Sequence, residues 1–255
     1  MNKNGFFVTL PSNASQLVYP NNKIWQFRTK LAKPLILQEP YEVGLIEIQY
    51  PRVWNSFTEN DAKVDFIDTK TKMFNKLRLT VGSYNTIDSI VKEYNMKCAA
   101  NPTLAHITMT HNPITNKILF TGGDGWNIVF KGRLAEILGF IPDSVFEIHI
   151  GPHLKCAAPH PADIHGGRYN IFIYSDIVDY QLVGDSHVPL LRCINISDES
   201  KRMPTLSYDS PHYTSLARSS ITDIQIELRD DQNQHIPFSY GKVIVKLHFR
   251  PVKQH

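Results

Sequence analysis

The sequence predicts an all-β protein, a single jelly-roll β sandwich with short helical insertions between its strands. Three observations support this fold class. Residues 220–251 contain two segments in which apolar and polar side chains alternate, as in strands with one buried face. Many other short runs rich in β-branched and aromatic residues are separated by proline- and glycine-containing turns. Only two segments have a helical period, so roughly ten strands outweigh two short helices and select a two-sheet sandwich.

The two closing segments are expected to pair as an antiparallel hairpin across a polar connection. One hairpin alone is marginally stable in water, so its apolar face requires a second sheet. The residues expected on the buried face are Ile224, Ile226, Leu228, Val243, Val245, Leu247 and Phe249.

The remaining strands follow from β-rich runs bounded by turn residues. Before the first helix they are expected at 6–10, 23–31, 34–37, 42–54, 64–68 and 74–81. After it they are expected at 107–110, 118–121, 126–130, 168–178 and 187–196, and the run 213–218 leads into the closing hairpin.

Two segments are predicted to be helical. Apolar residues recur at helical spacing from Ile87 to Tyr94 behind Thr86, a competent N-cap, so a helix is expected over about 86–97. The segment 132–140 should form one or two turns, with Gly139 suited to a left-handed C-terminal cap.

Residues 151–168 have no apolar period and are rich in proline and glycine, so they are expected to form a long loop. With the helix at 86–97, this loop is read as an excursion from one jelly-roll domain that spans residues 1–255.

Composition argues against several classes of partner and against a disulfide framework. The chain has 27 Lys and Arg against 24 Asp and Glu, a balance too even for a main partner that is nucleic acid or an anionic membrane. The three cysteines, Cys98, Cys156 and Cys193, are widely spaced and predict no disulfide framework. We expect no membrane partner, because no segment reaches the roughly 18 apolar residues of a membrane span.

A cluster of possible metal ligands lies in and near the long loop. Its members are His149, His153, Cys156, His160, Asp163 and His165. Gly151 and Pro152 spoil a helical pairing of the first two histidines, and paired cysteines are missing, so no metal and no cofactor are expected. No H-x-H pair, G-x-S-x-G elbow or G-x-x-x-x-G-K loop occurs, so catalysis has no support. A lectin-like or metal-binding jelly roll and a cupin-like enzyme stay open as alternatives.

Charged residues between two late strands are candidates for a subunit interface. They are Asp176, Asp179, Asp185 and Arg192. The other interpretation is a solvated turn with a surface ion pair worth about 0–1 kcal/mol. As a subunit contact, such a pair would fix register more than it adds affinity.

Both ends of the chain are basic. The candidates for an inward-facing basic surface are Lys3, Lys23, Arg28, Lys30, Lys33 and Lys253. If the termini lie together at one end of the sandwich, this end could contact DNA weakly and without sequence specificity. Ordinary solvated strand lysines are an equally good explanation.

Five blocks of the sequence are specific enough for comparison with known families: LPSNAS, EVGLIEIQYPRVW, ILGF, IYSDIVDYQLVGDSHVPLLR and RDDQNQHIPFSYGKVIVKLHFR. In these blocks the chain resembles the minor capsid, or penton, proteins of Polinton (Maverick) elements and related virophage-like or adintovirus-like double-stranded DNA viruses, and packaged DNA would then be the partner of the basic ends. The resemblance implies a structural protein that forms homopentamers at icosahedral fivefold vertices, surrounded by a double-jelly-roll major capsid protein. It also implies a location in the virion, after assembly inside the host cell, for a viral or an endogenous copy.

Overall fold

The computed structural model describes residues 5–149, 156–196 and 203–252, which divide into two compact units. Unit 1 comprises Met1–Trp54 and Arg168–His255, and unit 2 comprises Asn55–Gly167. Each unit has its own hydrophobic core. The sequence suggested one domain with a helical insertion and a loop. In the structure, residues 55–167 form a second hydrophobic core, and in the sequence they stand between the two segments of unit 1.

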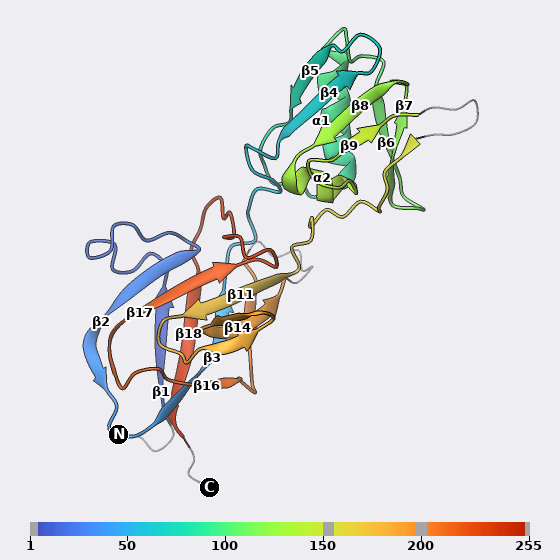
Figure 1. Cartoon of the computed structure of the whole chain (residues 1–255). Coiled ribbons are helices and arrows are strands. Elements are labelled where there is room, and N and C mark those ends of the chain that lie inside the picture. The colour runs from blue at the N-terminus through green and yellow to red at the C-terminus, as the bar shows by residue number, and fades with distance from the viewer. Residues whose placement is uncertain (1–4, 150–155, 197–202, 253–255) are drawn as a thin grey trace. The chain divides into compact units, whose positions relative to one another are not determined.

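The described part of unit 1 contains two large antiparallel sheets (Figure 1) and a separate two-stranded hairpin. The first has the order β1-β18-β3-β15, with β16 also paired to β3, and the second has the order β14-β11-β17-β2. The strands of the first sheet are β1 (Phe6–Pro11), β3 (Tyr41–Gln49), β15 (Thr205–Ser207), β16 (Tyr213–Ser215) and β18 (Ile244–Pro251). Those of the second are β2 (Gln26–Ile36), β11 (Asn170–Ser175), β14 (Leu190–Asn195) and β17 (Ser220–Arg229). β15 and β16 pair with the same side of β3 and together fill one strand position, so each sheet has four positions. Two antiparallel sheets with eight positions in this order form a jelly roll, which confirms the predicted fold class.

The predicted closing hairpin is wrong, although both of its strands exist. β17 pairs with β11 and β2, whereas β18 pairs with β1 and β3, so the two strands lie in different sheets. Their apolar side chains belong to the single core between the sheets, where Ile226 and Leu247 are both 0% exposed. The connection over residues 230–243 is long enough to cross from one sheet to the other, and the alternating pattern cannot reveal that.

The two ends of the described chain lie side by side in unit 1 (Figure 1). Phe6 at the start of β1 is opposite Phe249 near the end of β18, and their rings stack with centroids 5.0 Å apart. Tyr41 at the start of β3 is opposite Pro251. The ends of β1 and β18 and the start of β3 therefore share one end of the sandwich.

Unit 2 contains two further antiparallel sheets and two helices. One sheet has the order β5-β4-β8-β9 and the other the order β10-β7-β6. The first consists of β4 (Lys63–Asp68), β5 (Phe74–Arg78), β8 (Trp126–Phe130) and β9 (Val145–Glu147). The second consists of β6 (Thr108–Asn112), β7 (Lys117–Thr121) and β10 (Cys156–Ala157), and the helices are α1 (Ile87–Ala99) and α2 (Gly132–Leu138).

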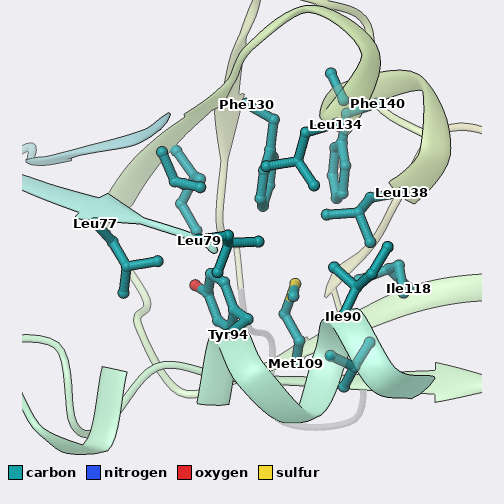
Figure 2. Packing of buried hydrophobic residues seen from close by; sticks show 14 of the residues in the cluster. Leu77, Leu79, Ile90, Tyr94, Met109, Ile118, Phe130, Leu134, Leu138 and Phe140 are labelled. Carbon is teal, nitrogen blue, oxygen red and sulfur yellow. The ribbon is translucent and has the colours of Figure 1, made fainter. Parts of the chain in front are cut away.

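Both helices begin and end close to where the sequence predicts. The Thr86 side chain accepts a hydrogen bond from Ser89 N at 3.2 Å, and this cap starts α1. Ile90 and Tyr94 project from α1 into the core toward Phe130 and Leu134 (Figure 2). Gly139 ends α2 at φ 80°, the left-handed conformation that glycine adopts without a Cβ penalty.

The second half of the predicted long loop belongs to the fold of unit 2. β10 pairs with β7, and Ala158 N then donates to Ile118 O. Ala158 and Ala162 are 1% and 2% exposed. Residues 156–167 therefore close the core of unit 2, and the expectation of an exposed loop over 151–168 is corrected for this part.

Candidate assembly surfaces

Asp176, predicted to lie at a subunit interface, is engaged within unit 1. Its Oδ1 accepts from Gln225 N at 2.8 Å, and its Oδ2 accepts from Arg218 Nη2 at 2.9 Å. Arg28 Nη2 lies 3.7 Å from the same Oδ2. The carboxylate thus ties the end of β11 to β17 and β2, and its charge is already compensated.

Arg192 also contacts its own unit. Its guanidinium carbon lies 3.5 Å from the centre of the Tyr208 ring, a cation–π geometry that joins β14 to the segment after β15. Among the contacts of the described residues, none joins Arg192 to Asp179 or Asp185. The predicted aspartate–Arg192 ion pair is therefore not formed within the chain.

Asp179 and Asp185 lie at the base and tip of a small projecting hairpin. Its strands are β12 (Gln181–Val183) and β13 (Ser186–Val188), which pair with each other. Both aspartates are exposed. Tyr180 and Leu182 on the same hairpin are 60% and 81% exposed. The hairpin therefore presents apolar and acidic side chains together to solvent.

The predicted basic surface is only partly present as free charge. Arg28 Nη1 donates to Asp223 Oδ1 at 2.8 Å and its Nη2 donates to Gln225 Oε1 at 2.7 Å, so Arg28 is paired. Lys23, Lys30 and Lys33 are exposed. Lys23 precedes β2 and Lys33 is near its other end, so these lysines do not share one end of the sandwich. Lys3 and Lys253 lie outside the described residues.

The outer edge of β2 is covered by the preceding loop. Asn22 Oδ1 accepts from Arg28 N and its Nδ2 donates to Arg28 O, both at 2.9 Å. Ser15 Oγ accepts from Lys30 N at 3.0 Å. Beside these contacts is a surface pocket of about 440 Å³, lined in part by Tyr19 and Arg28. The charged side chain in the lining, Arg28, is already paired with Asp223, so the pocket offers a ligand little unpaired charge.

The predicted metal ligands lie at several separate positions of unit 2. His149 Nε2 is 3.3 Å from Glu147 Oε2, and Cys156 Sγ is 3.7 Å from Glu147 O. Farther along the chain, His160 N donates to Gly139 O, and His165 N donates to Asp163 Oδ1. His153 lies outside the described residues. Over the described ranges, no three His, Cys, Asp or Glu side chains are grouped so that they could hold a metal ion.

A second connected polar site, the junction, lies in unit 1, where the chain re-enters this unit at Arg168. The Arg168 and Asp230 side chains are 5% and 0% exposed and form an ion pair at 3.3 Å. Asp231 accepts hydrogen bonds from the backbone N–H groups of Tyr169 and Asn170 at 2.7 and 2.8 Å. Trp54, which ends the first part of unit 1, forms a bridge with Phe238.

This junction was not predicted from the sequence. Asp230 and Asp231 stand in a polar connection, where aspartates are common turn residues, so nothing local distinguishes them from solvated ones. Their partners are about 60 residues away, as the separations of 62 and 61 positions show. Burial of the Asp231 carboxyl raises its pKa, but hydrogen bonds from the Asn170 side chain and from backbone N–H groups outweigh burial and leave the pKa below the ordinary value.

Two further features bear on the class of protein. All three cysteines are free thiols, with Cys98 buried and Cys193 exposed. Among the described residues, neither helix has the length and apolar character needed to cross a membrane.

Comparison with solved structures found chains of similar fold, among them a viral penton protein. No protein-family model matches the sequence, and no curated protein matches it. The crystal structure of the selenomethionine-labelled mavirus penton protein is similar over 96% of this chain and 99% of that chain, at 11% identity and a TM-score of 0.48.

Proposed function

We propose that this chain is a structural capsid protein, the penton subunit of an icosahedral viral shell, which assembles as a closed homopentamer at the fivefold vertices. A double-jelly-roll major capsid protein would surround it, and the assembled protein would reside in the virion. The observation that carries the proposal is the position of the sequence blocks that resemble penton proteins. EVGLIEIQYPRVW forms β3 and leads to Trp54, and RDDQNQHIPFSYGKVIVKLHFR forms the junction loop and β18.

Another of these blocks, IYSDIVDYQLVGDSHVPLLR, forms the end of β11, the projecting hairpin and the start of β14. These three blocks thus build strands of the jelly-roll framework, the loop at which the chain re-enters unit 1 and the projecting hairpin. This pattern favours a protein whose function lies in its shape and surfaces. Two internal ion pairs, Arg28 with Asp176 and Arg168 with Asp230, support the same conclusion, because these charges stabilise the framework.

The proposal is tested by the oligomeric state. Mass photometry and negative-stain microscopy of the purified chain, alone and co-expressed with its major capsid protein, should show fivefold rings in at least one setting. A heterologous interface, in which different patches of neighbouring subunits meet, is what closes such a ring. Monomers in both settings would contradict the proposal.

The same preparations distinguish the alternative functions. A monomer that retains a glycan or a metal ion would favour the ligand-binding jelly roll, and metal-dependent turnover would favour the cupin-like enzyme.

A further inference from the structure

We propose that the β12–β13 hairpin of one copy packs against the exposed end of β2, residues 30–36, of the neighbouring copy. The contact would be heterologous, with an acidic and apolar surface on one side and a basic and apolar surface on the other. The inference rests on the proposed ring and assigns the residues that would close it.

Among the described residues, the hairpin is anchored to its own unit by the Gln181 side chain, which donates to Leu190 O, but it joins neither large sheet. Its strands pair as Gln181↔Val188, Leu182↔His187 and Val183↔Ser186, and no other described strand pairs with them. A two-stranded hairpin of this size is at best marginally stable in water without an apolar face to pack on. Leu182 is 81% exposed, so the described part of the chain leaves an apolar side chain of the hairpin available to a second molecule.

The charge of the hairpin is negative. Residues 176–191 contain three aspartates and neither lysine nor arginine. Asp176 is compensated by Arg28 and Arg218, but Asp179 and Asp185 are exposed. The side chains offered to a partner are therefore two carboxylates beside Tyr180 and Leu182.

The exposed end of β2 has the complementary character. Lys30 and Lys33 are exposed, and Ile36 is 66% exposed. Asp223, the cross-strand neighbour of Lys30, is bound by Arg28 at 2.8 Å and is not free to neutralise the lysine. Pro34 and the irregular pairing between Ile221 and Asp223 block regular strand addition, so a contact here would be made by side chains.

The two surfaces lie at the same end of the sandwich and on different sides of it. Asp179 N donates to Ser215 O at the base of the hairpin, and Leu37 N donates to Ser219 O just after β2, so both elements flank residues 215–219. In the order β14-β11-β17-β2, however, β2 is one edge, and the hairpin connects the two strands at the other. Complementary patches at one level on opposite sides are what a rotational, head-to-tail ring requires.

Charge reversal tests this contact. Asp179→Lys with Asp185→Lys should raise the concentration at which the oligomer dissociates by about tenfold or more at low salt, because like charges would then face each other. Lys30→Glu with Lys33→Glu should do the same, and the chain that carries all four changes should regain wild-type assembly. The matched control is Lys70→Glu with Lys92→Glu, two exposed lysines of unit 2, which should leave assembly unchanged.

Leu182→Ser tests the apolar part of the contact and should weaken assembly in a manner that salt does not alter. Circular dichroism and thermal midpoints, measured on each variant, show whether it is folded. Folded reversal variants with wild-type assembly, or a four-residue swap that fails to restore it, overturn the inference. A loss of binding to a DNA duplex upon Lys30→Glu with Lys33→Glu, without any change in oligomer, also overturns it and assigns these lysines to DNA.

The outcomes separate this inference from the proposed function. If the charge-reversal variants form rings as the wild type does, the penton function is retained and the hairpin contact is overturned. A dimer or other oligomer that is broken by each reversal and restored by the swap supports the contact and overturns the pentamer. A wild-type chain that stays monomeric alone and with the major capsid protein overturns both.

Discussion

The side chain of Asn95, on α1, forms hydrogen bonds with both the backbone N–H and the backbone C=O of Met109, as a neighbouring strand would. Its side-chain oxygen accepts from Met109 N and its amide nitrogen donates to Met109 O, each at 2.8 Å. β6 is the edge of the order β10-β7-β6, so the carboxamide occupies the position of a peptide group in a further strand. Asn22 makes the same pair of bonds with Arg28 at the edge of β2.

Asn95→Ala should therefore destabilise unit 2. Met109 is 0% exposed, and the loss of its polar partner should cost about 1–3 kcal/mol in the free energy of unfolding. Hydrogen exchange of the Met109 amide and a denaturant curve read out the effect. Asn95→Asp keeps only the acceptor and should fall between the wild type and Asn95→Ala; equal stability of all three would rule out the role assigned to this side chain.

Leu247→Ala tests the core of unit 1. Leu247 is 0% exposed on β18, and its truncation should cost about 2–5 kcal/mol because it leaves a cavity between the sheets. The control is Lys246→Ala: this half-buried residue lies on the outer face, with Nζ 5.4 Å from the centre of the Phe7 ring, and should cost less than about 1 kcal/mol. A denaturation midpoint that barely moves for Leu247→Ala would contradict the assignment.

The junction at Asp231 should be sensitive to acid. The pKa of Asp231 is lower in the folded chain than the unfolded value of about 3.9. Its carboxylate therefore contributes stability above that value, and the contribution is lost as pH falls through the folded pKa. The protection factors of the Tyr169 and Asn170 amides, taken relative to the intrinsic exchange rate at each pH, should fall below about pH 4 in the wild type.

Asp231→Asn should speed exchange at these two amides at neutral pH and reduce their acid dependence. Asp209→Asn, at an exposed aspartate of the same unit, is the control and should leave both amides protected as in the wild type. Exchange rates in Asp231→Asn that match the wild type across this pH range would show that the carboxylate does not hold the junction.

Metal content remains a prediction. Protein purified without a histidine tag should contain less than one zinc, nickel or iron per chain, because the described candidate ligands His149, Cys156, His160 and His165 lie at separate positions. Elemental analysis and the thermal midpoint with and without EDTA measure this. One tightly held metal per chain that disappears in the double variant His153→Ala and His160→Ala would contradict the prediction.

Local patterns in the sequence predicted most of the elements. The alternation around Ile226 and Leu247 identified both closing strands, and Thr86 and Gly139 marked the start of α1 and the end of α2. These signals succeed because side-chain direction and capping depend on neighbours along the chain. Strand pairing does not, and for that reason β17 and β18 were assigned to one hairpin when each belongs to a different sheet.

The division into two units was invisible for a related reason. Strands of the same character run on both sides of Trp54 and of Arg168, so composition does not change where one core ends and the next begins. The subunit interface stays a prediction, for which the exposed Asp179 and Asp185 are available. The engagement of Asp176 by Arg28 and Arg218 depends on contacts between distant segments. No local pattern encodes those contacts.

Unit 2 leaves unit 1 after Trp54 and returns at Arg168, and these two residues meet, with the Arg168 guanidinium carbon 5.9 Å from the centre of the Trp54 ring. Both are held by the segment that contains Asp230 and Phe238. An insertion whose two ends are adjacent in the host can be exchanged without stretching the framework. Residues 55–167 thus form a replaceable cassette, so a short linker or an unrelated domain with neighbouring termini could occupy the same position while the jelly roll keeps its strand order.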